Sequence, residues 1–253
     1  MSSSTPVWPA GHDRRVLAEV DSTNAEAARI AATLAGPTWI LALRQTAGRG
    51  RRGRAWNDPP GNFAATLAIP SGAAPAQAAL RSFVAALALA DALTQATARP
   101  EAISLKWPND VLLNGAKVAG ILLETTGQGG TPGPLAIGIG VNLSHAPDPG
   151  TLEPEAKAPT SVLSATGAAI DPESFLDLLA PAFARWEATL RQHGFAPLRR
   201  AFLDRAARFG EPITARTLRE TLTGTFTDID ETGALVLTTA KGPVAVQAAD
   251  IFF

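Results

Sequence analysis

Short apolar runs alternate with longer stretches of mixed apolar and small residues along most of the chain. The short runs predict buried strands at 39–43, 63–69, 103–106 and 135–143. The longer stretches predict helices at 25–35, 75–97, 172–193 and 196–207. Because strands and helices do not follow a regular strand–helix–strand order, the pattern predicts an α+β fold with a mixed or antiparallel sheet and flanking helices.

The clearest turn signal in the chain is Asn114-Gly115, which separates two apolar runs. Asn-Gly suits a two-residue hairpin turn, because both positions need positive φ angles. We therefore predict a hairpin of strands 111–113 and 117–124. The polar run 21–24 (Asp-Ser-Thr-Asn) precedes the helix at 25–35 and is typical of a helix cap.

From residue 210 onward the pattern changes to short alternating strands rich in Thr, Val and Ile. We expect these strands at 212–218, 222–229, 234–239 and 244–248. Short strands at such close spacing indicate a small β-barrel. The sequence therefore predicts two domains, 1–209 and 210–253.

Composition narrows the class of protein. The chain has 253 residues, 46% of them hydrophobic, and a net charge of -1, so it can bury a core but lacks the positive charge of a general nucleic-acid binder. It has no cysteine, which excludes disulfides, thiolate metal sites and thioester catalysis. We see no secretory signal, and the apolar stretch 83–93 is too short to span a bilayer. We expect a cytoplasmic protein.

The segment 45–56 joins three glycines to four arginines. Glycine lets backbone N–H groups approach a ligand closely, and arginine forks bind phosphate or carboxylate. The segment therefore predicts an anion site. Taken alone, it leaves open a small-molecule phosphate, a nucleic acid or a merely solvated surface.

Further polar groups interrupt the apolar strands. The five residues 106–110 (Lys-Trp-Pro-Asn-Asp) end one strand, Lys117 lies inside another, and Asn142 follows Gly138 and Gly140, where something must approach the backbone. For Lys117 and Asn142, ligand binding and an ordinary structural role both fit. No P-loop, serine elbow or histidine metal spacing occurs, so any catalysis must rest on positioning and charge.

The segments 21–24, 45–56, 106–110, 117–124 and 138–142, in this order, closely resemble the biotin protein ligase family. The resemblance extends from about residue 20 to residue 253. It implies a catalytic domain like that of class II aminoacyl-tRNA synthetases and an SH3-like C-terminal β-barrel. Few residues precede the first segment, so the chain resembles the ligase-only class, which lacks a DNA-binding domain.

The resemblance also implies a reaction. Biotin and Mg-ATP would give biotinyl-5′-AMP and pyrophosphate, and a lysine of a biotin carboxyl carrier protein would then take the biotin through a new C–N bond. ATP and Mg²⁺ would act as a substrate complex, with no nucleic-acid or membrane partner. The family includes monomers and dimers, which leaves a homodimer open.

Roles for individual residues follow from the resemblance. The catalytic residues would be Arg49, Arg51 and Lys117, and Asp110 would help to hold Mg²⁺. Biotin would contact Ser22, Thr23, Asn24, Gln45, Gly48, Arg49, Gly50, Arg51 and Lys117. ATP would contact Arg51, Arg52, Arg54, Trp56, Asn109, Lys117 and Asn142, with Trp56 stacked on adenine. The segment 45–56, called the Arg/Gly segment below, would become ordered when an anion binds, because its arginines repel one another until then.

Alternatives remain at this stage. A lipoate ligase shares the catalytic fold and adenylate chemistry, although the Arg/Gly segment and the C-terminal β-domain favour biotin. An RNA-binding module would interleave aromatic residues with charge, whereas segment 45–56 has only Trp56 and the chain has no tyrosine. A pseudo-enzyme that binds biotin or a carrier protein without transfer is a third alternative. The chain ends in Phe253, where some relatives carry a basic residue that reaches the nucleotide.

Overall fold

The computed structural model describes residues 7–56, 58–70, 75–125, 133–148 and 159–253. Its centre is a seven-stranded sheet in the order β1-β2-β3-β7-β6-β5-β4. β1 runs parallel to β2 and the other neighbours are antiparallel, so the sheet is mixed, as predicted. The strands are β1 (Asp13–Leu17), β2 (Thr38–Ala42), β3 (Phe63–Ile69), β4 (Ile103–Lys106), β5 (Asp110–Leu113), β6 (Ala116–Thr125) and β7 (Leu135–Val141).

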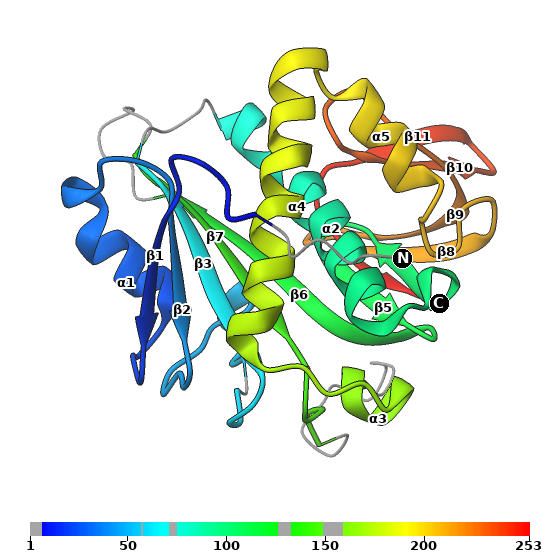
Figure 1. Ribbon diagram of the computed structural model, residues 1–253. Coiled ribbons are helices and arrows are strands. Elements are labelled where there is room, and N and C mark those ends of the chain that lie inside the picture. Colours follow the sequence, from blue (N-terminus) through cyan, green and yellow to red (C-terminus); the bar gives the residue numbers. More distant parts are fainter. Residues whose placement is uncertain (1–6, 57, 71–74, 126–132, 149–158) are drawn as a thin grey trace.

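Helices cover both faces of this sheet. The long helices α2 (Pro75–Thr97) and α4 (Pro172–His193) lie across one face, as Figure 1 shows. The short helix α1 (Thr23–Ile30) lies on the opposite face, where Ala27 packs with Ile40 of β2. The remaining α-helices of the described residues are α3 (Val162–Thr166) and α5 (Ala196–Leu203).

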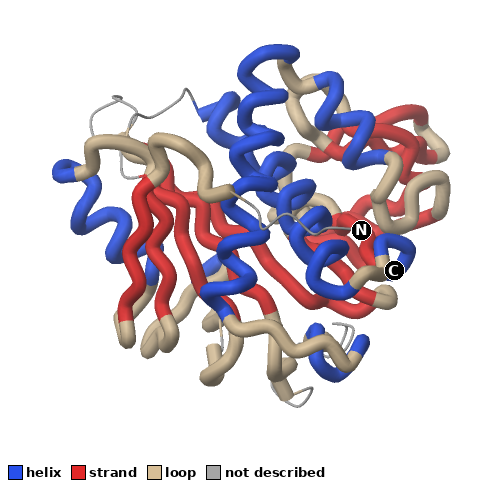
Figure 2. Tube along the Cα trace, viewed as in Figure 1, coloured by secondary structure: helices blue, strands red, loops and turns tan. Residues whose placement is uncertain are grey.

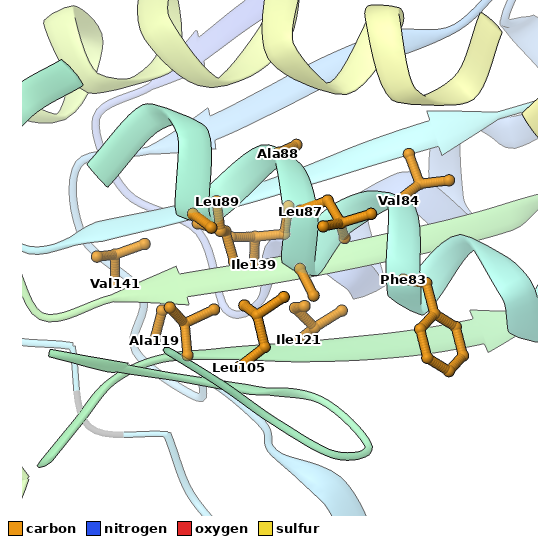
Figure 3. Packing of buried hydrophobic residues seen from close by; sticks show 14 of the residues in the cluster. Phe83, Val84, Leu87, Ala88, Leu89, Leu105, Ala119, Ile121, Ile139 and Val141 are labelled. Carbon is orange, nitrogen blue, oxygen red and sulfur yellow. The ribbon is translucent and has the colours of Figure 1, made fainter. Parts of the chain in front are cut away.

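The main core lies between the sheet and α2 and α4. Figure 3 shows Leu87 of α2 beside Ile139 of β7, with Ile121 of β6 in the same cluster. Each such side chain contributes about 1.5–3 kcal/mol when it is fully buried. Edge-to-face ring contacts tie α4 to the strands, with centroid distances of 5.7 Å for Trp39–Phe183 and 5.1 Å for Phe63–Phe175. Every residue of β2 and all but the last residue of β3 are buried. Because helices cover both faces of these strands, their sequences are almost continuously apolar.

Helix α2 is apolar over a longer stretch than residues 83–93. By length and composition alone, Ala76–Thr97 could cross a membrane, but 61% of its most apolar window is buried inside this protein. The central helix of a folded core passes the same test, so the stretch is weak evidence for a membrane span.

A second, five-stranded antiparallel sheet forms the C-terminal part, in the order β11-β10-β9-β8-β12. Figure 2 shows it as a separate group of strands beside the helical layer. It contacts Trp107, the residue that follows β4 of the first sheet. The indole Nε1 of Trp107 donates to the Gly233 carbonyl at 3.0 Å. Its strands are β8 (Pro212–Arg216), β9 (Thr221–Ile229), β10 (Leu235–Thr239), β11 (Gly242–Val246) and β12 (Asp250–Phe252).

Element boundaries follow the sequence pattern where burial is strong. β3, β4, α2 and α4 begin and end where predicted, and Asn114 and Gly115 have the expected φ angles of 51° and 76°. The predicted helix 25–35 is instead α1, which begins at Thr23 and ends at Ile30 before a 3₁₀ turn. The edge strand β1 was not predicted, because it is polar and only partly buried. The short elements β12 and α3 were not predicted either, because three and five residues are too few to show a hydrophobic periodicity.

Candidate active site

Small residues form a floor on the sheet face that carries α1. Thr66 of β3 lies between Ile40 and Gly138 in the strand register, and its chain neighbours Ala65 and Leu67 point into the main core on the other face. On β7 and β6, Gly140 pairs with Gly120 in the same way. The sheet therefore has a shallow strip without bulky side chains.

The glycines of this strip permit close approach, as the sequence suggested. A Cβ atom on Gly138 would lie 2.4 Å from Asn24 Oδ1, and one on Gly140 would lie 2.4 Å from Trp56 Cε2. Both distances are far shorter than a van der Waals contact. Helix α1 and the Arg/Gly segment thus both rest directly on the backbone of β7.

Neutral polar groups gather where α1 begins. Ser22, Thr23 and Asn24 are 4%, 4% and 7% exposed. Gln45 Oε1 accepts from the Thr23 backbone N–H at 2.9 Å, and it lies 3.2 Å from Thr23 Oγ1. Ser22 occupies the N-cap position but its side chain makes no capping hydrogen bond, which corrects the simple capping interpretation of residues 21–24. These hydroxyl and amide groups are matched to an uncharged polar ligand.

A buried hydrogen-bond network continues from this group, and two of its members were not predicted. Thr66 is fully buried, and its Oγ1 lies 2.8 Å from Thr23 Oγ1 and 2.6 Å from Asn24 Oδ1. Asn24 Nδ2 donates to Glu124 Oε2 at 2.7 Å. A threonine inside the otherwise apolar strand β3 was the only sequence signal for Thr66.

Asp58 is a further buried group that the sequence did not single out. It is 9% exposed, and neither carboxyl oxygen has a well-formed hydrogen bond within the described part of the chain. Burial raises the pKa of Asp58 to about 6, although nearby N–H groups of Gln45 act in the opposite direction. The carboxyl therefore lies beside the Gln45 amide that meets Thr23.

Lys117 lies at the other end of the glycine strip. Its Nζ forms an ion pair with Asp110 Oδ1 at 2.7 Å and lies 5.9 Å from the centre of the Trp56 ring. The pair joins β6 to β5 at the polar 106–110 segment. This structure gives Asp110 a lysine partner, so its predicted role as a magnesium ligand stays a prediction. Within the described ranges, no three His, Cys, Asp or Glu residues gather as a metal-binding group.

Arg51 is the most enclosed cation of the Arg/Gly segment. Its Nη1 donates to Asn109 Oδ1 at 3.2 Å, and Asn109 Nδ2 donates to the Ile121 carbonyl at 2.7 Å. Burial lowers the pKa of Arg51, and the carboxylates of Asp250 and Asp110 partly oppose this shift. An arginine stays charged in spite of such a shift, so Arg51 is a partly desolvated cation held by Asn109.

The rest of the Arg/Gly segment folds back on itself. Gly50 N–H donates to the Arg54 carbonyl at 2.7 Å, and the exposed Arg49 pairs with Ala55 through the backbone. Arg52 forms an ion pair with Asp250 of β12, and Arg54 lies 3.4 Å from the same carboxylate. We expected the arginines of this segment to repel one another until a ligand ordered them. In this structure the Asp250 carboxylate already offsets that repulsion.

Asn142, the last predicted nucleotide contact, serves the backbone in this structure. It is 1% exposed, and its Nδ2 donates to the Thr160 carbonyl at 3.1 Å. Its Oδ1 has no hydrogen-bond partner among the residues that the structure describes. The amide therefore holds the segment before α3, and contact with ATP stays a prediction.

Comparisons with known proteins agree with this geometry. Residues 16–142 match the model of the biotin/lipoate A/B protein ligase family, and residues 209–253 match that of the biotin protein ligase C-terminal domain. The chain is 58% identical over 239 residues to the biotin–[acetyl-CoA-carboxylase] ligase of Paracoccus denitrificans, covering 94% of this chain and 99% of that protein.

More distant relatives extend the comparison. The bifunctional ligase/repressor BirA of Bacillus subtilis is 33% identical over 217 residues, which cover 85% of this chain and 65% of that protein. Among solved structures, the biotin protein ligase from Aquifex aeolicus in complex with biotin and ATP has a TM-score of 0.78 and 25% identity. That match covers 94% of this chain and 97% of the solved chain.

Proposed function

Since this chain belongs to the biotin/lipoate protein ligase family, we propose that it is a cytoplasmic, ATP-dependent biotin protein ligase. It activates biotin as biotinyl-5′-AMP and transfers it to a lysine of a biotin carboxyl carrier protein. The relatives named as biotin ligases, and the solved relative with biotin and ATP bound, support this proposal.

One arrangement carries the proposal. A neutral polar group (Thr23, Gln45) and a cationic group (Arg51, Lys117) lie at the two ends of the same glycine-floored strip, with Trp56 packed on the strip between them. Biotin has a neutral cyclic urea at one end and a carboxylate at the other. The strip therefore offers each end of biotin a partner of the right polarity.

In the first step, a carboxylate oxygen of biotin attacks the α-phosphorus of ATP. A new P–O bond forms, and the bond to the β-phosphate oxygen breaks to release pyrophosphate. Both reactants are anions, so the approach requires fixed positive charge rather than a protein nucleophile. Arg51 and Lys117 supply it, with Asn109 and Asp110 holding their heads.

In the second step, the amine of the acceptor lysine attacks the acyl carbon of biotinyl-5′-AMP. The C–N bond of the amide forms, AMP leaves with the electrons of the C–O bond, and the amine loses a proton to solvent. Lys117 stabilises the negative charge on the departing phosphate. The ring of Trp56 stacks on adenine and keeps the adenylate in place, a contact worth about 1–3 kcal/mol by analogy with base stacking.

We assign the remaining predicted residues within the same scheme. Arg49 joins Arg51 and Lys117 at the carboxyl and phosphate groups, and Arg52 and Arg54 approach the polyphosphate. Gly48 and Gly50 line the biotin carboxyl, and Ser22, Asn24 and Gln45 surround the cyclic urea. Asn142 lies at the nucleotide. Residues 1–209 form the catalytic domain and residues 210–253 the C-terminal domain.

Magnesium enters this scheme with its substrate. Mg²⁺ usually rides on nucleotide phosphates with several waters and few carboxylates. Asp110 is already paired with Lys117, and among the described residues no three His, Cys, Asp or Glu side chains gather as a metal-binding group, so the protein donors do not fit a resident metal. We therefore assign Mg²⁺ to the ATP substrate.

The decisive experiment has two arms. In the first, the protein is incubated with α-labelled ATP, Mg²⁺ and either biotin or lipoate, and the adenylate is resolved by chromatography. Biotinyl-AMP is expected, and lipoyl-AMP alone would overturn the assignment. In the second arm, a purified carrier domain and its Lys→Arg variant at the acceptor position are added. Adenylate formation without transfer to the carrier would show that the protein activates biotin but is not a biotin protein ligase.

A further inference from the structure

The buried network behind Thr23 has a direction, and this direction determines what Thr23 offers a ligand. Glu124 carries a carboxylate, which only accepts hydrogen bonds. The Asn24 atom that lies 2.7 Å from Glu124 Oε2 must therefore be the amide nitrogen. This fixes the orientation of the Asn24 amide, so that Oδ1 faces Thr66.

Thr66 passes this direction on. Asn24 Oδ1 can only accept, and it lies 2.6 Å from Thr66 Oγ1, so the single hydroxyl proton of Thr66 points to Asn24. Thr66 Oγ1 also lies 2.8 Å from Thr23 Oγ1. Since Thr66 has no second proton, the Thr23 hydroxyl must donate in this contact.

The Thr23 hydroxyl is thereby left as an acceptor. Its proton points down to Thr66, and the Gln45 oxygen is still satisfied by the Thr23 backbone N–H at 2.9 Å. Thr23 Oγ1 then has no proton left to donate and can only accept from a ligand. Thr66 is fully buried and Asn24 is 7% exposed, so solvent does not compete with the hydrogen bond between these two side chains.

We propose that Glu124, Asn24 and Thr66 form a positioning relay that holds the Thr23 hydroxyl as an acceptor for an N–H group of the cyclic urea of biotin. The inference rests on the proposed function and adds to it a source of specificity. A cyclic urea presents N–H donors, whereas the dithiolane ring of lipoate presents none. A relay locked to accept favours the first ligand and leaves the second without a partner.

The rest of the strip is built around this relay. Gly138 lies beside Thr66 in the register, and any side chain there would collide with Asn24. Glu124 is the exposed end of the relay and comes from β6, the strand that also carries Lys117. The same strand therefore bears the residue that sets the acceptor and the cation proposed for the acyl phosphate.

The test measures binding of biotin and of its two mono-N-methyl derivatives by isothermal titration calorimetry. In the wild type, one of the two methyl groups blocks the N–H that meets Thr23, so that derivative should bind at least tenfold more weakly than biotin. Thr66→Val keeps the side-chain shape and removes the hydroxyl. It should weaken biotin about tenfold while reducing the penalty of that methyl group severalfold.

Four matched variants separate positioning from packing. Thr66→Ser restores the hydroxyl and should bind like the wild type. Thr38→Val removes a hydroxyl of the same kind from the neighbouring strand, where it is 1% exposed and donates to the Gly36 carbonyl at 3.1 Å. It should leave both affinity and methyl discrimination unchanged. At the exposed end, Glu124→Met should weaken biotin a fewfold, and Glu124→Gln, which keeps an acceptor oxygen, should not.

The outcomes are distinct. A wild-type protein that does not bind biotin would refute the proposed function itself. A wild type that binds biotin, with Thr66→Val showing either unchanged affinity or an equal loss for biotin and both derivatives, would refute the relay. In steady-state assays the relay predicts that Thr66→Val raises the KM for biotin about tenfold and leaves kcat nearly unchanged.

Discussion

Lys117 Nζ lies 2.7 Å from Asp110 Oδ1, on two neighbouring strands of the central sheet. The pair is partly enclosed, with side chains 38% and 19% exposed. The ion pair with Asp110 fixes the orientation of the Lys117 side chain. Lys117 therefore needs little reorganisation to bind an acyl phosphate. The pair also shows why two polar residues recur in otherwise apolar strands: each is the other's partner.

Replacement of Lys117 by alanine should slow biotinyl-AMP formation about 100-fold or more, because a preorganised positive charge is lost. The measurement is release of labelled pyrophosphate, with circular dichroism to confirm that the fold is kept. Lys241→Ala, which removes an exposed lysine from the turn between β10 and β11, is the matched control. Equal rates in the wild type and in Lys117→Ala would remove Lys117 from the chemistry.

Arg51→Ala should slow the same step about 100-fold or more, whereas Asn109→Ala should slow it less, since it only frees the guanidinium to move. Single-turnover adenylation, followed by quenching and chromatography, gives both rates. The exposed Arg44, paired with Glu19, provides the control substitution Arg44→Ala. If Arg44→Ala were as damaging as Arg51→Ala, general charge rather than position would be the cause.

Gly140→Ala should weaken ATP binding about tenfold or more. The added methyl group would meet the Trp56 ring at 2.4 Å, so the indole must leave the strip, and a stacking contact worth about 1–3 kcal/mol is lost. The KM for ATP reports the loss. Trp56→Phe, which retains a smaller ring, should be milder, and an unchanged KM in Gly140→Ala would show that Trp56 does not serve the nucleotide.

The titration of Asp58 should make the free energy of unfolding depend on pH. Its pKa is about 6 in the folded protein, above its ordinary value of 3.8, so the folded state holds the proton more tightly. The stabilisation is fully present below about pH 4 and is lost as the pH rises to about 6. Chemical denaturation of wild type and Asp58→Asn at pH 4.5 and 7.5 measures it.

Asp58→Asn should be up to about 3 kcal/mol more stable than the wild type near neutral pH, because it removes an ionised buried carboxyl. Near pH 4 the two proteins should be similar. A stability difference that does not change with pH would contradict the assignment of this titration to Asp58.

Asp250→Asn should make the Arg/Gly segment easier to cleave with trypsin in the absence of ligand. Asp250 forms ion pairs with Arg52 and Arg54, and with its charge gone the arginines of the segment repel one another. Cleavage sites are read by mass spectrometry. Glu211→Gln, which removes an exposed partner of Arg208 on the same C-terminal part, is the control. The same cleavage rate in all three proteins would show that Asp250 does not hold the segment.

Much of the fold could be predicted from periodicity. The strand 63–69 and the helices 75–97 and 172–193 appear with the predicted bounds, because each is long or fully buried and its apolar pattern is strong. β1 could not be predicted in the same way, since an edge strand with the sequence Asp-Arg-Arg-Val-Leu is held by backbone pairing to β2 rather than by an apolar face.

Part of the candidate site could also be predicted. Lys117 interrupts an apolar strand, Trp56 ends the Arg/Gly segment and Asn109 lies in the polar run 106–110. The structure brings them together at the glycine strip. Thr66, Glu124 and Asp58 could not be selected, because a threonine or a glutamate in a strand and a single carboxyl in a loop are common in sequences. The burial of Thr66 and Asp58 and the hydrogen-bond partners of Thr66 and Glu124 are visible only in the tertiary structure.

By itself the sequence determined the elements and the polar residues available for chemistry, because apolar periodicity records which face of each element is buried. The tertiary structure alone decided which residue lies opposite which. Asn24 meets Glu124 across 100 positions of the chain, and Arg52 meets Asp250 across 198. Such pairs depend on strand order and on the close approach that Gly138 and Gly140 allow, and no local pattern encodes them.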